Sequence, residues 1–154
     1  MASSVTVLSV DALRNAVADF FVSIYEKFST VQSVDEDKPA PTTIEDIYAI
    51  TYNLDGYKVV FENNNEFSRD ITYVNSDIII EFSQYTKDMY NKNVNTEDAE
   101  ISTTEINGTE AIIFLDNQNY YHIIINSDDY VFDIGSNIGK DALIDIAESV
   151  QKVE

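Results

Sequence analysis

The chain has 154 residues, with 28 Asp and Glu against 9 Lys and Arg, so its formal net charge is −19. Binding to nucleic-acid phosphates depends on clustered Lys and Arg, and their scarcity excludes that class of function. Hydrophobic residues make up 44% of the chain and aromatic residues 12%, which is too apolar for a disordered acidic segment. The length is that of one domain, and we expect a single domain over residues 1–154.

Residues 9–30 are predicted to form a helix. Their apolar residues recur at spacings of three or four, which places them on one side of a helix. These residues are Leu13, Val17, Phe20, Ile24 and Phe28. The next residues, 31–43, are mostly polar and contain Pro39 and Pro41, which cannot continue a helix. We expect them to form a linker.

Residues 44–135 are predicted to form an antiparallel sheet, because β-rich stretches alternate with turn residues and carry no helical pattern between them. The expected strands are 44–53, 57–61, 67–74, 78–85, 99–106, 110–115, 120–125 and 130–134. Asp55-Gly56 is expected to join the first two as a hairpin, and Asn107-Gly108 gives the strongest hairpin signal. On strand 78–85, Glu81 and Ser83 face away from the apolar side, so one face of the sheet is expected to be wet.

Residues 139–152 are predicted to form a second helix. Leu143, Ile146, Ala147 and Val150 stand at helical spacing after the turn at residues 135–139. The expected fold is therefore α+β: an antiparallel meander of seven to eight strands, with the N-terminal and C-terminal helices covering one face.

Most catalytic and metal chemistries lack their residues here. The chain has no Cys and one His, so thiolate nucleophiles, Cys-ligated zinc and His-ligated zinc are not expected. No phosphate-binding glycine motif is present. Three acidic groups suggest calcium, but none has the spacing of a calcium-binding loop, and a solvated acidic surface explains them better. These groups are Asp35 to Asp37, Glu97 to Glu100, and Asp128, Asp129 and Asp133. We expect no catalytic residue, cofactor or metal.

The candidate interaction surface consists of Tyr120, Tyr121 and His122, which are consecutive on one predicted strand. The alternation of side chains places His122 on the face opposite Tyr121. From Asn93 through Gly139 the chain carries no Lys or Arg, so this half of the sheet should repel polyanions and anionic lipid.

Four segments resemble a family of uncharacterised domains from Gram-positive gut bacteria. They are SVDALRNAVADFFVSIYEKFST, ITYNLDGYKVV, EINGTEAIIF and YVFDIGSNIGKDALIDIAESV. The resemblance covers nearly the whole chain. In that family the domain lies on the outer side of single-pass membrane proteins, many of them described as anti-sigma factors or lipoproteins. Relatives often carry Trp where this chain has His122, and if that Trp serves a binding surface, the resemblance implies a different ligand here.

The resemblance implies location and architecture but supplies no catalytic residues. It implies an extracytoplasmic, membrane-anchored domain, with residues 2–8 as the outer end of a membrane helix that this chain lacks. Anchoring by a lipid is the other possibility. The first hypothesis is a non-enzymatic sensing or interaction domain whose partner is an unidentified protein or envelope polymer. The alternatives are an exported binding module for an envelope glycan or lipid fragment, and an enzyme with a carboxylate pair.

Overall fold

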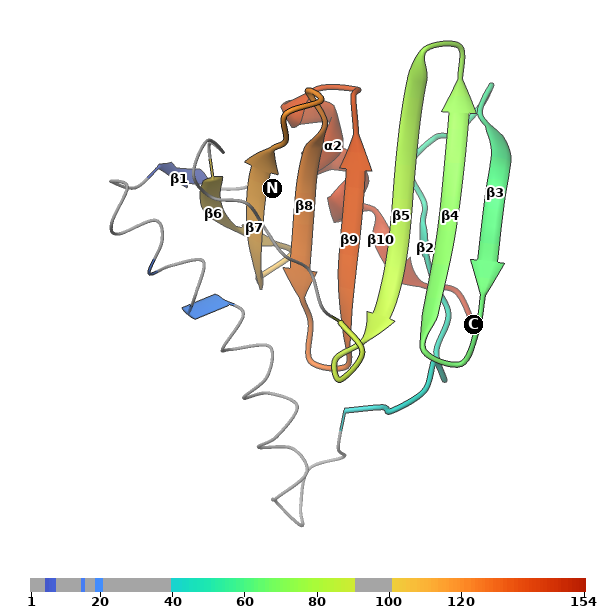
Figure 1. Cartoon of the computed structure of the whole chain (residues 1–154), viewed down its shortest axis with the longest axis vertical. Helices are drawn as coiled ribbons and strands as arrows, with labels where there is room; N and C mark the ends of the chain where they lie inside the picture. Colours follow the sequence, from blue (N-terminus) through green and yellow to red (C-terminus); the bar gives the residue numbers. More distant parts are fainter. Residues whose placement is uncertain (1–4, 8–14, 16–18, 21–39, 91–100) are drawn as a thin grey trace.

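The computed structural model describes residues 5–7, 15, 19–20, 40–90 and 101–154, and it consists mainly of antiparallel sheet (Figure 1). The strands of the main sheet are, in spatial order, β1 (Val5–Val7), β6 (Ile101–Ile106), β7 (Thr109–Leu115), β8 (Tyr121–Asn126), β9 (Tyr130–Ser136), β5 (Ile78–Thr86), β4 (Ser68–Asn75) and β3 (Lys58–Asn64). A small second sheet pairs β2 (Tyr48–Ile50) with β10 (Val150–Lys152). Helix α2 (Lys140–Glu148) lies just before β10.

The main sheet contains two meanders rather than the single one that we expected. Strands β3 to β5 form the first and β6 to β9 the second, and the two join where β5 pairs with β9. Each pair of neighbouring strands is antiparallel, as predicted. The alternation of apolar residues specifies which face of a strand is buried, but it does not specify which strand lies beside it.

The hairpin predicted around Asp55-Gly56 is wrong, although the turn itself is present. Gly56 has φ +86°, and the N–H of Tyr57 donates to the carbonyl of Leu54 over 2.9 Å. The chain then moves from the small sheet to the main sheet, so β2 pairs with β10 and β3 pairs with β4. The hairpin predicted at Asn107-Gly108, between β6 and β7, is confirmed, and β4 and β5 also pair as a hairpin. Asn107 and Gly108 adopt φ values of 51° and 79°, as a type I′ turn requires.

The C-terminal helix is shorter than predicted. Leu143, Ile146 and Ala147 are buried as their spacing indicated, but α2 ends at Glu148 and Val150 belongs to β10. The hydroxyl of Ser149 donates to the carbonyl of Ile146 over 2.6 Å and satisfies one of the last carbonyls of the helix. After Ser149 the chain forms backbone hydrogen bonds with β2 instead, and a longer helix would not make these bonds.

The predicted first helix and linker fall largely outside the described residues. Asn15, Asp19 and Phe20 are helical, and residues 40–43 contain no helix or strand. Phe20 packs in a cluster on the face of the sheet opposite α2, so the expectation that both helices cover one face is wrong at this residue. The described chain is rich in sheet with a minor helical part, rather than clearly α+β.

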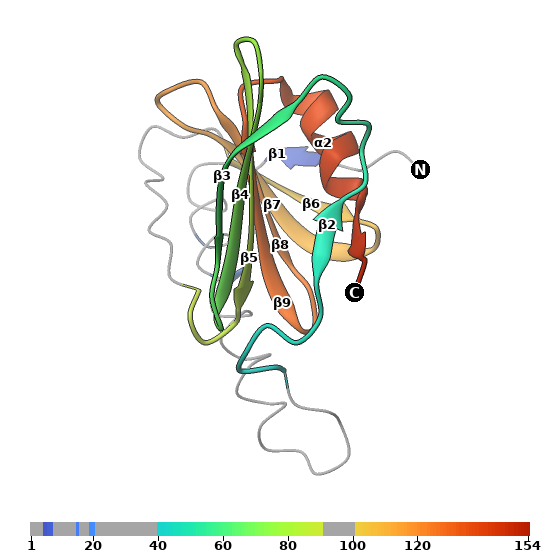
Figure 2. The ribbon, with the colours of Figure 1, turned by 90° about the vertical axis from the view of Figure 1, so that its right-hand side faces the viewer.

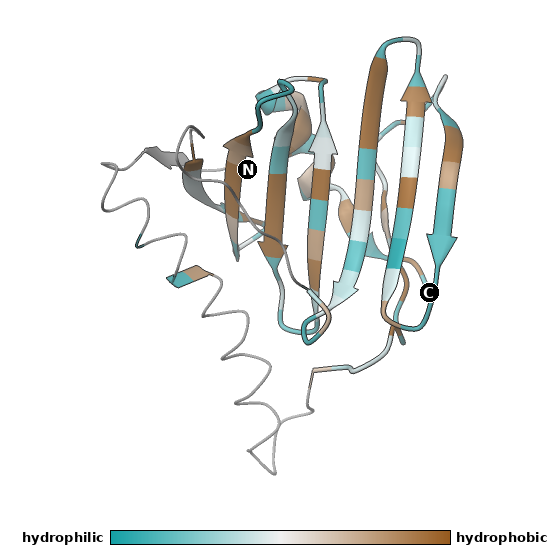
Figure 3. Cartoon of the chain, viewed as in Figure 1, coloured by the Kyte–Doolittle hydropathy of each residue, from teal (hydrophilic) through white to brown (hydrophobic). Residues whose placement is uncertain are grey.

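The two faces of the main sheet differ. Helix α2, β2 and β10 lie on one face, which we call the helix face (Figure 2). The opposite face, which we call the far face, carries an apolar cluster over β6 to β9, beside the polar side chains of His122 and Asp133. The buried apolar residues of the sheet there are Ile101, Ile112, Phe114, Ile124 and Val131. Over β3 to β5 the far face is polar, since Glu81 is exposed and Ser83 is half-buried beside buried Phe82. In the middle of β5 apolar and polar residues alternate (Figure 3), whereas its first three residues are all Ile.

Buried polar side chains attach the segment that leads into β2. Arg69 donates from Nη1 to the carbonyl of Tyr48 over 2.7 Å, and Gln84 donates from Nε2 to the carbonyl of Asp46 over 2.9 Å. The hydroxyl oxygen of Tyr130 accepts hydrogen bonds from the backbone N–H of Glu45 and of Asp46, over 3.0 and 3.2 Å. These bonds hold the small sheet on the helix face, and they account for the burial of polar groups in this layer.

Candidate functional site

Strand β3 forms one edge of the main sheet, and all seven of its residues are exposed. Val59, Val60 and Phe61 are 52%, 62% and 54% exposed. A β-bulge between Val59 and Phe61 leaves Val60 outside the register with β4. Proteins protect apolar edge strands with covers, bulges or charged residues, because the backbone groups and apolar side chains of an edge attract other chains. Strand β3 has a bulge and Lys58, but its apolar run from Val59 to Phe61 stays exposed. This edge is therefore a candidate for contact with a partner.

A hollow of about 340 Å³ lies beside β3 on the far face. Phe61 of β3 is opposite Thr72 of β4, and Thr72 is opposite Glu81 of β5. The small side chain of Thr72 thus lies between two larger ones. Asp70 and Ser83 line the same hollow from the neighbouring row. We call Val59, Val60, Phe61 and the lining of this hollow the edge surface.

The two carboxylates of the hollow are not neutralised by a cation within the described part of the chain. Asp70 accepts hydrogen bonds from the hydroxyls of Ser83 and Tyr85, over 2.7 and 3.3 Å, and from the amide of Asn63 over 3.5 Å. All three donors are neutral. Glu81 is exposed, and the ion pairs of the described residues involve neither it nor Asp70. The hollow is therefore negative, with an aromatic ring at its outer side.

The imidazole of His122 lies on the same face, two strands further along this row. Its Nε2 is 2.9 Å from Oδ2 of Asp116, and its Nδ1 is 3.7 Å from Oδ1 of Asp133. The ring stacks on Phe114 with 4.9 Å between centroids and 9° between planes. The side chain of His122 is 14% exposed. Aromatic stacking and two flanking carboxylates together fix its position.

Asp116 is held in the turn between β7 and β8. The backbone N–H groups of Gln118 and Tyr120 donate to its Oδ1 over 2.8 and 2.9 Å. Burial raises the pKa of Asp116, but the hydrogen bonds from Tyr120, His122 and Gln118 outweigh burial and lower the pKa below its ordinary value. The carboxylate thus stays ionised and orients the imidazole.

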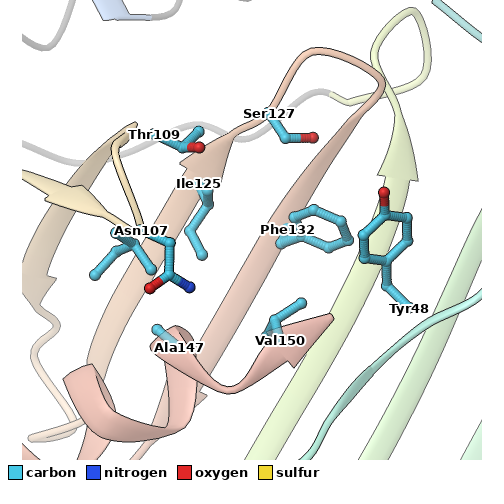
Figure 4. Close-up of a pocket in the computed structure, with 9 residues that line it drawn as sticks. Tyr48, Asn107, Thr109, Ile125, Ser127, Phe132, Ala147 and Val150 are labelled. Carbon is cyan, nitrogen blue, oxygen red and sulfur yellow. The ribbon is translucent and has the colours of Figure 1, made fainter. Parts of the chain in front are cut away.

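A second hollow, of about 140 Å³, lies on the helix face where α2 meets β10 (Figure 4). Figure 4 shows Asn107 at one end, Tyr48 at the other and Phe132 between them. Its apolar lining consists of Ile106, Ile125, Phe132, Ala147 and Val150. Burial, and then the charges of Asp129 and Asp46, raise the pKa of Tyr48, so its hydroxyl stays protonated. Typical ligand pockets measure about 300–1,000 Å³, so this hollow fits a small apolar group only.

A family model, described as a domain of unknown function (DUF4367), matches residues 47–150. This chain belongs to the DUF4367 family. The DUF4367 match runs from just before β2 to the first residue of β10, so the two strands of the small sheet lie at its ends. Comparisons with curated proteins and with solved structures gave no match.

The residues predicted as the interaction surface do not form one surface in this DUF4367 domain. Tyr121 packs against the core cluster of the helix face, whereas His122 lies on the far face between Asp116 and Asp133. Tyr120 contributes its backbone to the turn at Asp116. The edge surface was not among the predicted residues. The sequence did indicate the polar face of the edge surface, through the alternation that separates Glu81 and Ser83 from Phe82. It could not indicate that β3 is exposed, because this depends on the place of β3 in the sheet.

The described His, Asp and Glu side chains of the DUF4367 domain do not gather in groups of three or more that could hold a metal ion. Asp133 lies beside His122, while Asp35 to Asp37 and Glu97 to Glu100 fall outside the described residues. In the part of the chain that the structure describes, no helix is both long enough and apolar enough to cross a bilayer.

Proposed function

We propose that this chain is a non-enzymatic sensing or interaction domain of a membrane-anchored, extracytoplasmic protein of the anti-sigma-factor type. We place its contact with the partner at the edge surface. The observation that carries this proposal is the exposure of Val59, Val60 and Phe61 on an edge strand. Burying a Val or Phe side chain gains about 1.5–3 kcal/mol, so a partner strand would gain apolar contacts as well as backbone hydrogen bonds.

The surroundings of His122 support a role without catalysis. A histidine that acts as general base directs one ring nitrogen at the nucleophile and the other at an orienting acid. Both ring nitrogens of His122 face carboxylates, and the ring is stacked on Phe114. This arrangement fits a residue that stabilises the far face.

Location and anchoring come from the resemblance to domains on the outer side of single-pass membrane proteins. In this proposal a contact at the edge surface changes the domain, and the change passes along the membrane helix to the inside of the cell. The partner is a protein or an envelope polymer.

The test is photo-crosslinking of the full-length protein in its native cells, with the crosslinking amino acid at position 60. The matched control places it at position 118, which is exposed in the β7–β8 turn. We expect an adduct from position 60 that is absent from position 118. Equal adducts at both positions, or none at position 60, would contradict the placement of the site. Protection of the domain from protease added to intact cells would contradict the extracytoplasmic location.

A second candidate is a binding module for an envelope glycan or lipid fragment. The apolar lining of the hollow on the helix face favours it, although its volume of about 140 Å³ leaves room for little more than the end of a chain. Ala147→Leu would fill this hollow. Loss of a bound fragment in that variant, detected by native mass spectrometry of protein purified from its own cells, would favour this candidate.

A further inference from the structure

We infer that the partner presents an extended polypeptide segment that pairs with β3 and places one Lys or Arg side chain in the hollow between Phe61 and Glu81. This inference rests on the proposed function and names the class of partner for the same site. Three observations lead to it: the position of β3 at the end of the sheet formed by the described residues, the negative hollow beside it, and the net charge of the chain.

The edge of β3 determines the shape of the partner. It ends the main sheet, and its side chains are exposed on both faces. An extended segment added there would continue the backbone ladder, and its alternate side chains would reach the far face. A helix or a folded loop would leave the backbone groups of β3 without partners. The apolar run from Val59 to Phe61 gives the incoming strand contacts on both faces.

The hollow determines the charge of the partner. A side chain on the added strand, opposite Phe61 on the far face, is next to the hollow that Asp70 and Glu81 line. Strands lie about 4.8 Å apart, so a long side chain can extend past Phe61 toward the carboxylates, whereas a short one cannot. The methylene stem of Lys or Arg packs on the ring of Phe61 and its charged head extends toward Asp70, two strands away, while Glu81 on the next strand adds attraction over a longer distance.

Lys58 limits the register of the partner. Lys58 lies on β3, as Phe61 does, but before the bulge, where it pairs with Val74 of β4. Its positive charge disfavours a second positive charge on a partner strand at that end of the edge. The negative hollow lies after the bulge. One register therefore matches a segment with a single cation near the centre of its paired stretch.

The charge of the whole chain disfavours a second copy as the occupant. Each copy carries a formal charge of −19, and residues 93–139 contain no Lys or Arg. Two such chains repel each other at moderate salt, whereas a cationic segment is attracted and oriented before contact. The same field disfavours an anionic membrane surface.

The test measures binding of the whole 154-residue chain to a short, labelled peptide of alternating Thr and Val with one central Lys. The comparison peptide has Gln in place of Lys. We expect the Lys peptide to bind about two- to fivefold more tightly than the Gln peptide, and added salt to reduce this difference. Glu81→Gln combined with Asp70→Asn should remove the preference. Asp141→Asn combined with Asp145→Asn, a matched loss of two charges at exposed positions on α2, should retain it.

Each other outcome overturns the inference. Equal binding of both peptides would show an edge that adds a strand without selecting charge. Self-association of the chain that Val60→Lys abolishes, measured by sedimentation, would identify a second copy as the occupant. Failure of both peptides to bind would remove the extended segment as partner class. None of these results decides the proposed function, because the photo-crosslinking experiment at position 60 tests that separately. Melting of the variants near the Tm of the parent chain confirms that they fold.

Discussion

The backbone of Gly135 lies so close to the imidazole of His122 that a Cβ at position 135 would come within 2.9 Å of Cε1 and 3.0 Å of Nδ1. Gly135 is opposite both His122 and Glu81 in the register, so it sits between the histidine and the edge surface. The absence of a side chain at Gly135 is what lets His122 lie flat against Phe114 and bond to Asp116. A glycine inside a strand often marks such a close approach.

Gly135→Ala should therefore displace His122. Added volume in a packed region costs about 1–3 kcal/mol, and we expect the free energy of unfolding to fall by an amount in that range. Chemical denaturation measures it. In the His122→Ala background the same substitution should cost much less, because the clashing ring is gone. An equal cost in both backgrounds would contradict the proposed contact.

Asp116 should contribute stability that depends on pH. Its pKa in the folded chain is lowered, so the contribution is complete above the ordinary value of 3.8 and is lost as the pH falls through the folded value. Asp116→Asn keeps an acceptor for the turn but removes the charge. The difference in unfolding free energy between the two proteins should be greatest near neutral pH and should shrink below about pH 4. A constant difference across this range would contradict the assignment.

The hydroxyl of Tyr130 should be needed to hold the segment before β2. Tyr130→Phe leaves the N–H groups of Glu45 and Asp46 without their acceptor, and we expect a loss of about 1–2 kcal/mol. Hydrogen exchange of these two amides should quicken. Tyr121→Phe is the matched control, with an expected change within about 0.5 kcal/mol. Equal losses in the two variants would show that the hydroxyl of Tyr130 has no special role.

Alkaline pH should destabilise the chain. Among the described residues, burial raises the pKa of five tyrosines, and in the folded state each of them holds its proton to a higher pH than in the unfolded chain. They are Tyr48, Tyr57, Tyr73, Tyr85 and Tyr90. Stability should fall as the pH rises past the ordinary value of 10.0. Phenolate absorbance of the folded chain should show tyrosines that ionise only on unfolding, and Tyr90→Phe should reduce their number.

The local features of the fold could be predicted from the sequence, whereas the assembly of the sheet could not. Asn107-Gly108 identified its hairpin because only a few residues tolerate the backbone of that turn. The spacing of Leu143, Ile146 and Ala147 identified the buried side of α2. The pairings of β2 with β10 and of β5 with β9 join residues far apart in the sequence, and no local pattern specifies them.

The location of the candidate site could not be predicted from the sequence either, because it depends on the same long-range strand pairings. The alternation around Glu81 and Ser83 indicated a wet face, and this is what the structure has over β3 to β5. The exposure of Val59, Val60 and Phe61 follows from the position of β3 at the end of the sheet order. In the middle of the sheet the same three residues would have been ordinary core residues. Tyr120, Tyr121 and His122 were adjacent in sequence but lie on two faces and a turn.

Binding at the edge surface is tested most directly by titrating the isotope-labelled 154-residue chain with the single-Lys strand peptide and following the backbone amide signals of the chain by NMR. We expect the largest shifts at Val59 to Asn63 of β3 and at Thr72 and Glu81 beside the hollow. Shifts gathered instead around Tyr48 and Phe132, at the hollow on the helix face, would contradict binding at the edge surface, and so would the absence of shifts along β3.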